Sequence, residues 1–334
     1  MLDILKTLCT LSGPSGNETS VREFIISQID GFCEWKTDNI GNIIAFKKGK
    51  KTPAKKIMID AHTDEVGLII THITDNGFLR FSTLGGIDTA VLMFRRVLIN
   101  GKTLGVISGK PIHLTHGDEG KKLPKCDSLY IDIGASTREE AEKAVSLGDT
   151  AIICGDFMVS GDKILSKALD DRIGCAALIK LLRNDSEYDF YATFSTQEEL
   201  GLRGAKVAAF SVNPDAAIVL EGTTAADIAD VPNESQVCKL GSGAAVSFMD
   251  RSTLYDREYY NAALASGIPA QPKAAATGGN NAGSIHLSGK GVRTVAISAP
   301  CRYIHSASSV ADLRDINAVY ELAKYMLNYI AEND

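Results

Sequence analysis

The sequence has no stretch approaching the roughly 20 consecutive apolar residues that a membrane-spanning helix needs. It also lacks the positively charged start of a signal peptide, because the first charged side chain after Met1 is the acid Asp3. These two absences argue against a membrane partner and against secretion. We therefore expect a cytoplasmic protein.

Basic residues do not outnumber acidic ones, although six lysines fall within residues 47–56. The chain carries 35 Lys and Arg against 41 Asp and Glu, which gives a formal net charge of −6. Proteins that bind the backbone of nucleic acids present clustered positive charge. Nucleic acid is therefore excluded as an expected partner.

The seven cysteines include no Cys-x-x-Cys pair, and their number is odd. A chain of 334 residues can bury a sizeable core without disulfides, so the cysteines are expected to be reduced thiols. This excludes a zinc ribbon or a disulfide framework. Histidine, aspartate and glutamate remain as candidate ligands for a metal ion.

Strand and helix patterns alternate in the first and last parts of the chain, which favours a mostly parallel sheet in a three-layer α/β arrangement. The strand patterns lie at 40–46, 56–62, 191–195, 216–220 and 292–298. Helical periodicity covers 3–11, 18–29, 173–182, 204–209, 257–266 and 312–330.

The pattern changes from residue 68, where short strand-like runs are separated by Asn76-Gly77 and Asn100-Gly101, two sequences suited to tight hairpin turns. One helical stretch near 138–145 interrupts these runs. The length allows one large domain or two smaller ones. We expect a main α/β domain of residues 1–67 and 165–334, interrupted by a β-rich domain of residues 68–164.

Several predicted strands run directly into polar residues that can bind metals. His62 and Asp64 follow the second strand, Glu198 and Glu199 follow the third, and Glu221 follows the fourth. The last strand leads on to His305, while Asp170 opens a predicted helix; both complete the same set. Ligands of open α/β sheets bind outside the carboxyl ends of the strands, so these residues are expected to meet at one edge.

Each of these residues also has an ordinary structural explanation. His62 resembles a core histidine, and Asp170-Asp171 resembles a helix N-cap, a role that we assign to Asp171. Glu198 and Glu199 suit a helix N-terminus, and Glu221 could be an isolated charge on a loop. No single element is therefore specific.

As a set, the residues match the composition of a two-metal hydrolase. Such sites have one carboxylate that bridges the ions, with further His and carboxylate ligands on each ion. Two histidines, a bridging Asp and two terminal carboxylates leave positions open for water and substrate. Glu198 is then free to accept the proton of the water, and Asp64 could orient the ring of His62.

The motifs A-H-T-D-E-V-G, K-A-L-D-D-R-I-G, T-Q-E-E-L-G and R-Y-I-H-S resemble those of the tetrahedral aminopeptidase family. Members of this family carry names such as deblocking aminopeptidase, glutamyl aminopeptidase and cellulase M. The resemblance runs over essentially the whole chain, in order and with comparable spacing. It implies a zinc-peptidase-like α/β/α catalytic domain with an inserted β domain used in dimerisation, and a dimer-based homo-oligomer, such as a tetrahedral dodecamer, that admits peptide substrates.

Carried over position by position, the resemblance implies two divalent metal ions per subunit. It makes His62, Asp170 and Glu221 ligands of one ion, and Asp170, Glu199 and His305 ligands of the other. It further makes Glu198 the general base and Asp64 the residue that orients His62. The chain departs from the family pattern at two positions, with Glu221 and Asn281 where relatives often have Asp.

The metal itself stays open, since zinc, cobalt and manganese all accept His and carboxylate ligands. The preferred N-terminal residue also stays open. A two-metal deacylase of N-acyl amino acids is the alternative within the same chemistry, and a glycosidase or a non-catalytic scaffold are the alternatives outside it.

The remaining four histidines are expected to be structural or solvated: His72, His113, His116 and His286. His113 is the one of these four for which a functional role is also considered, because a histidine on a partner's insert could reach a neighbouring active site.

Overall fold

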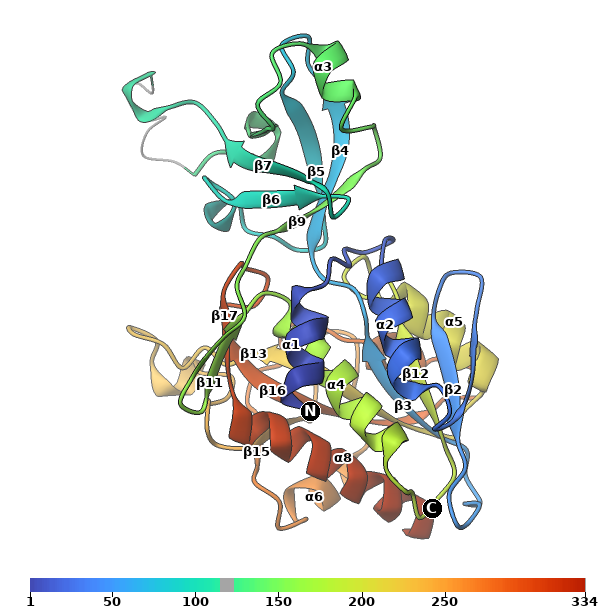
Figure 1. Ribbon diagram of the computed structural model, residues 1–334. Helices are drawn as coiled ribbons and strands as arrows, with labels where there is room; N and C mark the ends of the chain where they lie inside the picture. Colours follow the sequence, from blue (N-terminus) through green and yellow to red (C-terminus); the bar gives the residue numbers. More distant parts are fainter. Residues whose placement is uncertain (115–122, 334) are drawn as a thin grey trace.

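The computed structural model describes residues 1–114 and 123–333 (Figure 1). Its α-helices are α1 Leu2–Thr10, α2 Thr19–Ile29, α3 Arg138–Glu142, α4 Leu169–Arg183, α5 Arg203–Val212, α6 Arg257–Leu264, α7 Ala282–Ile285 and α8 Leu313–Asn333. The first nine strands are β1 Glu34–Thr37, β2 Ile43–Lys47, β3 Ile57–His62, β4 Gly67–Ile73, β5 Leu79–Leu84, β6 Arg96–Ile99, β7 Thr103–Ser108, β8 Tyr130–Asp132 and β9 Thr150–Ile153. The remaining strands are β10 Met158–Ser160, β11 Lys163–Ser166, β12 Phe190–Ser195, β13 Ala216–Thr224, β14 Ala244–Ser247, β15 Ala270–Lys273, β16 Arg293–Arg302 and β17 Ser309–Asp312.

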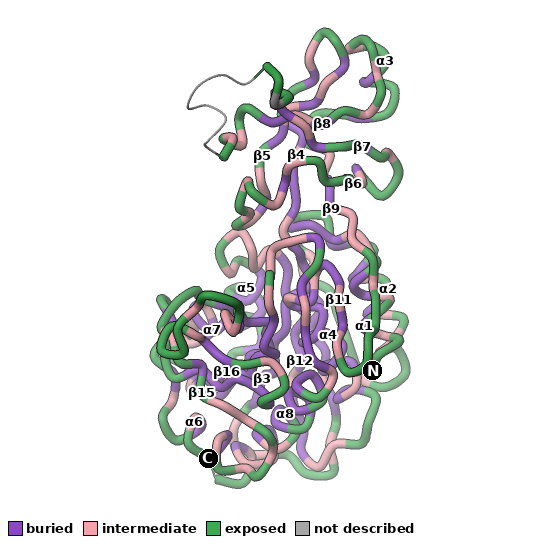
Figure 2. Tube along the Cα trace, turned by 90° about the vertical axis from the view of Figure 1, so that its left-hand side faces the viewer, coloured by how far each residue is buried: buried purple, intermediate pink, exposed green. Residues whose placement is uncertain are grey.

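A large mixed sheet forms the centre of the lower body in Figure 1, with strand order β1-β2-β12-β3-β13-β16-β17-β11-β10 and with β14 and β15 branching from β16. Its central strands β12, β3, β13 and β16 are parallel. β3 is buried over its whole length, as a strand covered on both faces must be. The buried strands enclosed by outer segments are visible in Figure 2.

Helices cover both faces of this sheet. Residues of α1, α2, α4, α6 and α8 share one buried apolar cluster with the strands. Residues of α5 and α7 form a second apolar cluster against the other face. The expected three-layer α/β/α architecture is confirmed.

A closed barrel of six strands, β4-β5-β8-β7-β6-β9, stands at one end of the layered body (Figure 1). Its interior is filled by its own apolar cluster, which includes Leu68, Val97 and Ile131. Asn100 and Gly101 both have positive φ and connect β6 to β7, as expected for this hairpin sequence. The barrel strands lie between residues 67 and 153.

The hairpin β10–β11 departs from the sequence expectation. Residues up to 164 were expected to be part of the inserted domain, but β11 pairs with β17 and therefore extends the large sheet. Short antiparallel strands have the same local pattern in a barrel and at a sheet edge, so only the long-range pairing distinguishes them. We propose a domain boundary near residue 154 in place of 164.

Candidate active site

The candidate site lies at the carboxyl ends of the parallel strands, where the polar residues singled out from the sequence come together. His62 is the last residue of β3, Glu221 lies in β13, and Glu199 follows β12. Asp170 precedes the regular part of α4, and His305 lies in the turn between β16 and β17. Parallel strands align these ends at one edge of the sheet.

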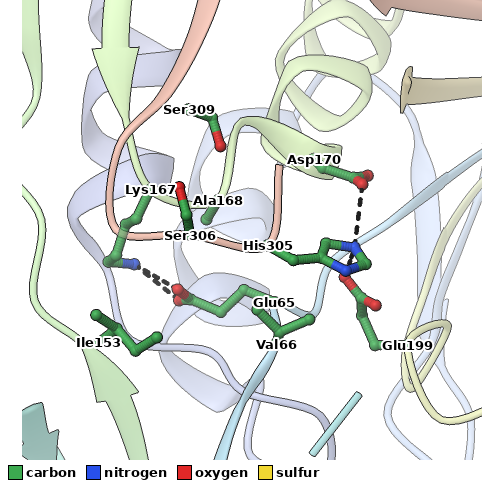
Figure 3. A pocket seen from close by; sticks show the side chains of 10 residues that line it. All are labelled: Glu65, Val66, Ile153, Lys167, Ala168, Asp170, Glu199, His305, Ser306 and Ser309. Carbon is green, nitrogen blue, oxygen red and sulfur yellow. Dashed lines mark hydrogen bonds and ion pairs between the residues drawn. The ribbon is translucent and has the colours of Figure 1, made fainter. Parts of the chain in front are cut away.

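The side chain of Asp170 lies between the two histidines. Its Oδ1 is 3.2 Å from Nε2 of His62, and its Oδ2 is 3.6 Å from Nε2 of His305. His62 Nε2 is also 3.3 Å from Glu221 Oε1, and His305 Nε2 is 3.2 Å from Glu199 Oε1. Figure 3 shows His305 between Asp170 and Glu199.

These contacts define two groups of possible metal ligands that share Asp170. One group is His62, Asp170 and Glu221, and the other is Asp170, Glu199 and His305; within each group the ligand atoms lie within 4.8 Å of one another. The buried Oε2 of Glu221 has no hydrogen-bond partner among the described residues. A buried carboxylate oxygen without a donor suits a cation, so the donor set fits metal ions.

The carboxylates and histidines shift one another's pKa. Although burial opposes charge on His305, the carboxylates of Asp170 and Glu199 raise its pKa to about 11. Burial also disfavours the charged form of His62, but Glu221, Asp170 and Asp64 raise its pKa well above the usual value. Burial raises the pKa of Glu198 to about 8, and the neighbouring Glu199 and Asp170 act in the same direction. The site therefore concentrates negative charge that a cation would neutralise.

Asp64 connects the first ligand to the loop that carries the two glutamates. Its Oδ1 is 3.3 Å from Nδ1 of His62 and accepts a hydrogen bond of 2.9 Å from the amide of Glu198. Its Oδ2 accepts hydrogen bonds from the amide of Glu199 at 3.1 Å and from Ser15 Oγ at 2.6 Å. The Asp64 carboxylate, which was expected to orient His62, thus also contacts Ser15 and the backbone amides of Glu198 and Glu199.

Asp171 takes the N-cap role assigned to it. Its Oδ1 accepts a hydrogen bond of 2.9 Å from the amide of Gly174, and its backbone is not helical. Its Oδ2 accepts a further bond from the amide of His62, 3.2 Å away. Asp170 and Asp171 therefore point to different partners.

Sequence reasoning missed two backbone contributions to the site. The carbonyl oxygen of Gly86, which follows β5 of the barrel, is 2.7 Å from Nδ1 of His305. Gly222 lies so close to Asp170 that a Cβ added there would be 2.9 Å from the Asp170 Cα. Gly86 belongs to no motif with polar side chains, and although Gly222 directly follows Glu221, no signal in a single sequence indicates its close approach to Asp170.

Asn281, one of the two departures from the family pattern, lies beneath the site and outside both ligand groups. Its Nδ2 donates hydrogen bonds of 2.8 Å to Asp60 Oδ2 and to Ser195 Oγ. The other departure, Glu221, is in the first ligand group. Of the two departures, Glu221 therefore bears on a possible metal ligand and Asn281 does not.

The remaining histidines lie elsewhere. His72 in β4 is exposed, and His286 ends α7 with Nδ1 2.7 Å from the Ala282 carbonyl oxygen. His113 is exposed in a short 3-10 helix, Ile112–Leu114, while His116 lies outside the described residues.

A cavity of about 350 Å³ opens beside the ligand groups. Asp170, Glu198, Glu199, Glu221 and His305 line it, together with Thr223, Lys273 and the segment 277–280. A smaller pocket, which shares Asp170, Glu199 and His305 with this cavity, is also lined by Lys167, whose Nζ is 2.8 Å from both carboxylate oxygens of Glu65 (Figure 3). The larger cavity is the one with room for a substrate.

Comparisons with known proteins agree with this fold and site. The profile of the M42 glutamyl aminopeptidase family matches residues 41–322. A lysyl aminopeptidase of Pyrococcus furiosus is 33% identical, over 99% of this chain and 98% of the relative. The structure of an aminopeptidase from the archaeon Desulfurococcus kamchatkensis superposes with a TM-score of 0.91 at 35% identity, over 97% of this chain and 93% of that one. The TET1 peptidase of Pyrococcus horikoshii, which can assemble into a tetrahedron or a large octahedral shell, gives a TM-score of 0.86 at 33% identity, over 97% and 98% of the two chains.

The fold and these relatives define the protein as a peptidase, and so as a hydrolase. The chain belongs to the M42 glutamyl aminopeptidase family. The family resemblance inferred from the sequence motifs is thereby confirmed. None of the helices in residues 1–114 and 123–333 has the length and apolar character that crossing a bilayer requires.

Proposed function

We propose that the protein is a two-metal aminopeptidase that removes the N-terminal residue of short peptides. The observation that carries the proposal is the position of Asp170, whose two carboxylate oxygens face His62 and His305 separately. A carboxylate between two histidines, each with a further carboxylate neighbour, matches the bridging ligand of a dinuclear hydrolase.

In this proposal His62, Asp170 and Glu221 hold one divalent ion, and Asp170, Glu199 and His305 hold the other. Bound ions of this kind polarise a carbonyl group and lower the pKa of a water molecule toward about 7. Zinc is the first expectation, with cobalt or manganese compatible with the same ligands. The protein residues then position the substrate and move the proton.

Glu198 is the proposed general base. It lines the cavity but belongs to neither ligand group, so its carboxylate is available for proton transfer. As a carboxylate it would accept the proton of the attacking water, and as an acid it would donate that proton to the leaving amine. Burial raises the pKa of Glu198 and so favours its acid form, whereas a nearby positive charge would favour the carboxylate form that accepts a proton.

Asp64 is the proposed positioning residue. Through its contacts it would hold the ring of His62 in one orientation and keep the backbone of Glu198 and Glu199 in place. Carboxylates that orient a metal-bound histidine typically change metal affinity or activity about 10- to 100-fold when removed.

We also propose that the enzyme assembles as a homo-oligomer in the cytoplasm and there degrades peptides. The polyhedral assemblies of the Pyrococcus horikoshii relative support the homo-oligomer, with a dimer as its expected unit and a dodecamer as one possible product. The seven cysteines are all free, as expected in a reducing compartment. Whether a partner's His113 approaches a neighbouring site stays a prediction.

The test compares the chelator-stripped wild type with Glu198→Gln and with the exposed control Glu139→Gln, on matched peptides with free and acetylated N-termini. After addition of zinc, cobalt or manganese, the wild type and the control should release N-terminal residues one by one. Glu198→Gln should bind the same amount of metal without turnover. Cleavage of acetylated substrates alone would favour the deacylase, and activity that survives exhaustive chelation would contradict a metal enzyme.

A further inference from the structure

The two ligand groups differ in how their side chains are supported. In the first group, His62 and Glu221 lie on β3 and β13, two central strands of the large sheet. In the second group, Glu199 lies in the loop after β12, and His305 lies in the turn between β16 and β17. Ladder hydrogen bonds fix the residues of a central strand, whereas the position of a loop residue depends on the segments packed against it. The second group therefore depends on its neighbours for support.

Those neighbours include the barrel. We call residues 85–86, which follow β5, the barrel loop. The carbonyl oxygen of Gly86 is 2.7 Å from Nδ1 of His305. Because a carbonyl oxygen only accepts hydrogen bonds, Nδ1 keeps its proton, and Nε2 is the nitrogen left for a metal ion. Gly85 lies so close to Glu199 that an added Cβ would be 3.1 Å from the Glu199 Cβ and 3.3 Å from its Oε2.

The turn that carries His305 is anchored in the barrel a second time. Ala307, two residues further along, is buried in the apolar cluster of the barrel. A Cβ added at Gly155, where the chain has just left the barrel, would be 2.3 Å from the carbonyl oxygen of Ala307. Tyr303 and His305 have φ values of 59° and 60°, a left-handed conformation that non-glycine residues keep only where the surrounding structure holds them. The shape of this turn therefore depends on the barrel.

The first group is held from within the α/β body. The ring of His62 lies against Asp64, and its strand is buried over its whole length. Val66 and Ile153, which lie where the chain enters and leaves the barrel, line the small pocket beside the second group (Figure 3). The boundary between barrel and body therefore passes next to the second group and leaves the first group inside the body.

We propose that the barrel is part of the second metal site: the barrel loop positions His305 and Glu199, so that the second ion is bound tightly only while the barrel is docked on the body. This assignment rests on the proposed two-metal function and adds Gly85 and Gly86 to it as positioning residues. Displacement of the barrel loop should release the second ion and spare the first. Binding of the second ion should in turn hold the barrel loop in place, because a ligand shifts the population toward the state that binds it better.

The test compares Gly85→Ala with the matched control Gly134→Ala. Both glycines follow barrel strands and have positive φ, 88° and 81°, so alanine carries a similar backbone cost at each. A Cβ at Gly134 would meet nothing within 4 Å, whereas one at Gly85 would press on Glu199. After dialysis, the wild type and Gly134→Ala should retain two zinc ions per chain. Gly85→Ala should retain one, because its affinity for the second ion should fall at least about tenfold.

Glu221→Gln identifies which ion is lost. This variant weakens the first group alone and should retain one ion, and the double variant Glu221→Gln, Gly85→Ala should retain none. Retention of both ions in Gly85→Ala would overturn the proposal, because the barrel loop would then not affect metal binding. Loss of both ions from Gly85→Ala, or one ion retained in the double variant, would also overturn it, because the effect would not be specific to the second group.

A second measurement leaves the barrel unchanged. Hydrogen exchange of residues 85–92 is followed in zinc-loaded and in chelator-stripped protein, for the wild type and for His305→Gln, with the turn between β6 and β7 as internal reference. Zinc should slow exchange of this segment in the wild type and not in His305→Gln, whose first ligand group is intact. Unchanged exchange in the wild type, or equal slowing in both proteins, would overturn the proposal.

Metal content and turnover together separate this proposal from the proposed function. If the wild type holds two ions and cleaves no peptide, while Gly85→Ala loses one ion, the aminopeptidase function fails and the role of the barrel stands. If the wild type cleaves peptides and Gly85→Ala keeps both ions, the function stands and the role of the barrel fails. A wild type that binds no second ion would contradict both.

Discussion

Asp64 lies 3.3 Å from Nδ1 of His62 and at the same time accepts hydrogen bonds from the amides of the two glutamates that follow β12. A single buried carboxylate thus joins a proposed metal ligand to the loop of the proposed base.

Asp64→Ala should therefore lower metal affinity and kcat together, each by about 10- to 100-fold, because both the His62 ring and the Glu198 backbone lose their anchor. Metal titration followed by peptidase assay measures both effects. Asp75→Asn, on an exposed turn of the barrel, is the control. Retention of full metal affinity and turnover in Asp64→Ala would contradict the positioning role.

Metal binding should release protons at pH 7. The neighbouring carboxylates raise the pKa of His305 to about 11 and that of His62 well above its usual value, so both rings carry a proton that an ion must displace. Metal affinity should accordingly fall as the pH is lowered. Calorimetry in two buffers of different ionisation enthalpy measures the release, and an identical heat in both buffers would contradict it.

Asn281→Asp should destabilise the protein more at pH 8 than at pH 5. Burial raises the pKa of Asp60 to about 6 even though Thr193, Asn281 and Ser195 donate hydrogen bonds to it. A carboxylate at position 281 would replace a donor 2.8 Å from Asp60 Oδ2, so one of the two acids must keep its proton in the folded state.

A carboxyl group whose folded-state pKa is raised stabilises the protein below the unfolded pKa, and that contribution is lost as the pH rises through the folded value. A shift of two units corresponds to a loss of about 3 kcal/mol in the free energy of unfolding. Chemical denaturation at pH 5 and pH 8 tests this, with the exposed Asn76→Asp as the control. An equal loss in the free energy of unfolding at both pH values would show that repulsion between Asp60 and the new aspartate is not the cause.

Gly222→Ala should weaken metal binding at Asp170. The added methyl group would meet the Asp170 Cα at 2.9 Å and would push the bridging carboxylate away from one histidine. Ser211→Ala, at an exposed position of α5, is the control. Metal content after dialysis should fall in the first variant and stay at the wild-type level in the second. Equal metal content in both would mean that the site tolerates the displacement.

The sequence predicted the parts of this structure that follow from local pattern and from the ends of parallel strands. The sequence predicted that three of the site residues lie close together, because parallel strands buried on both faces align their carboxyl ends; these residues are His62, Glu199 and Glu221. Asp171 could be assigned as an N-cap because the requirement is local.

The parts that were missed depend on contacts between distant segments. Gly86 reaches His305 from the barrel, and no periodicity connects residues 219 positions apart. Lys273 lies on a short strand with a proline at Pro272, which gave no strand pattern, so its place beside the cavity emerged only from the pairing of β14 and β15. The hairpin β10–β11 was predicted to be part of the insert because its pairing with β17, far along the chain, leaves no local pattern.

The most direct test of the two-metal site is anomalous diffraction from crystals of the zinc-loaded protein, combined with the metal content of the wild type and of Asp170→Asn. The account predicts two anomalous peaks per chain about 3.5 to 4 Å apart, one on each side of Asp170, and loss of at least one ion in the variant. A single peak away from Asp170, or unchanged metal content in Asp170→Asn, would contradict it.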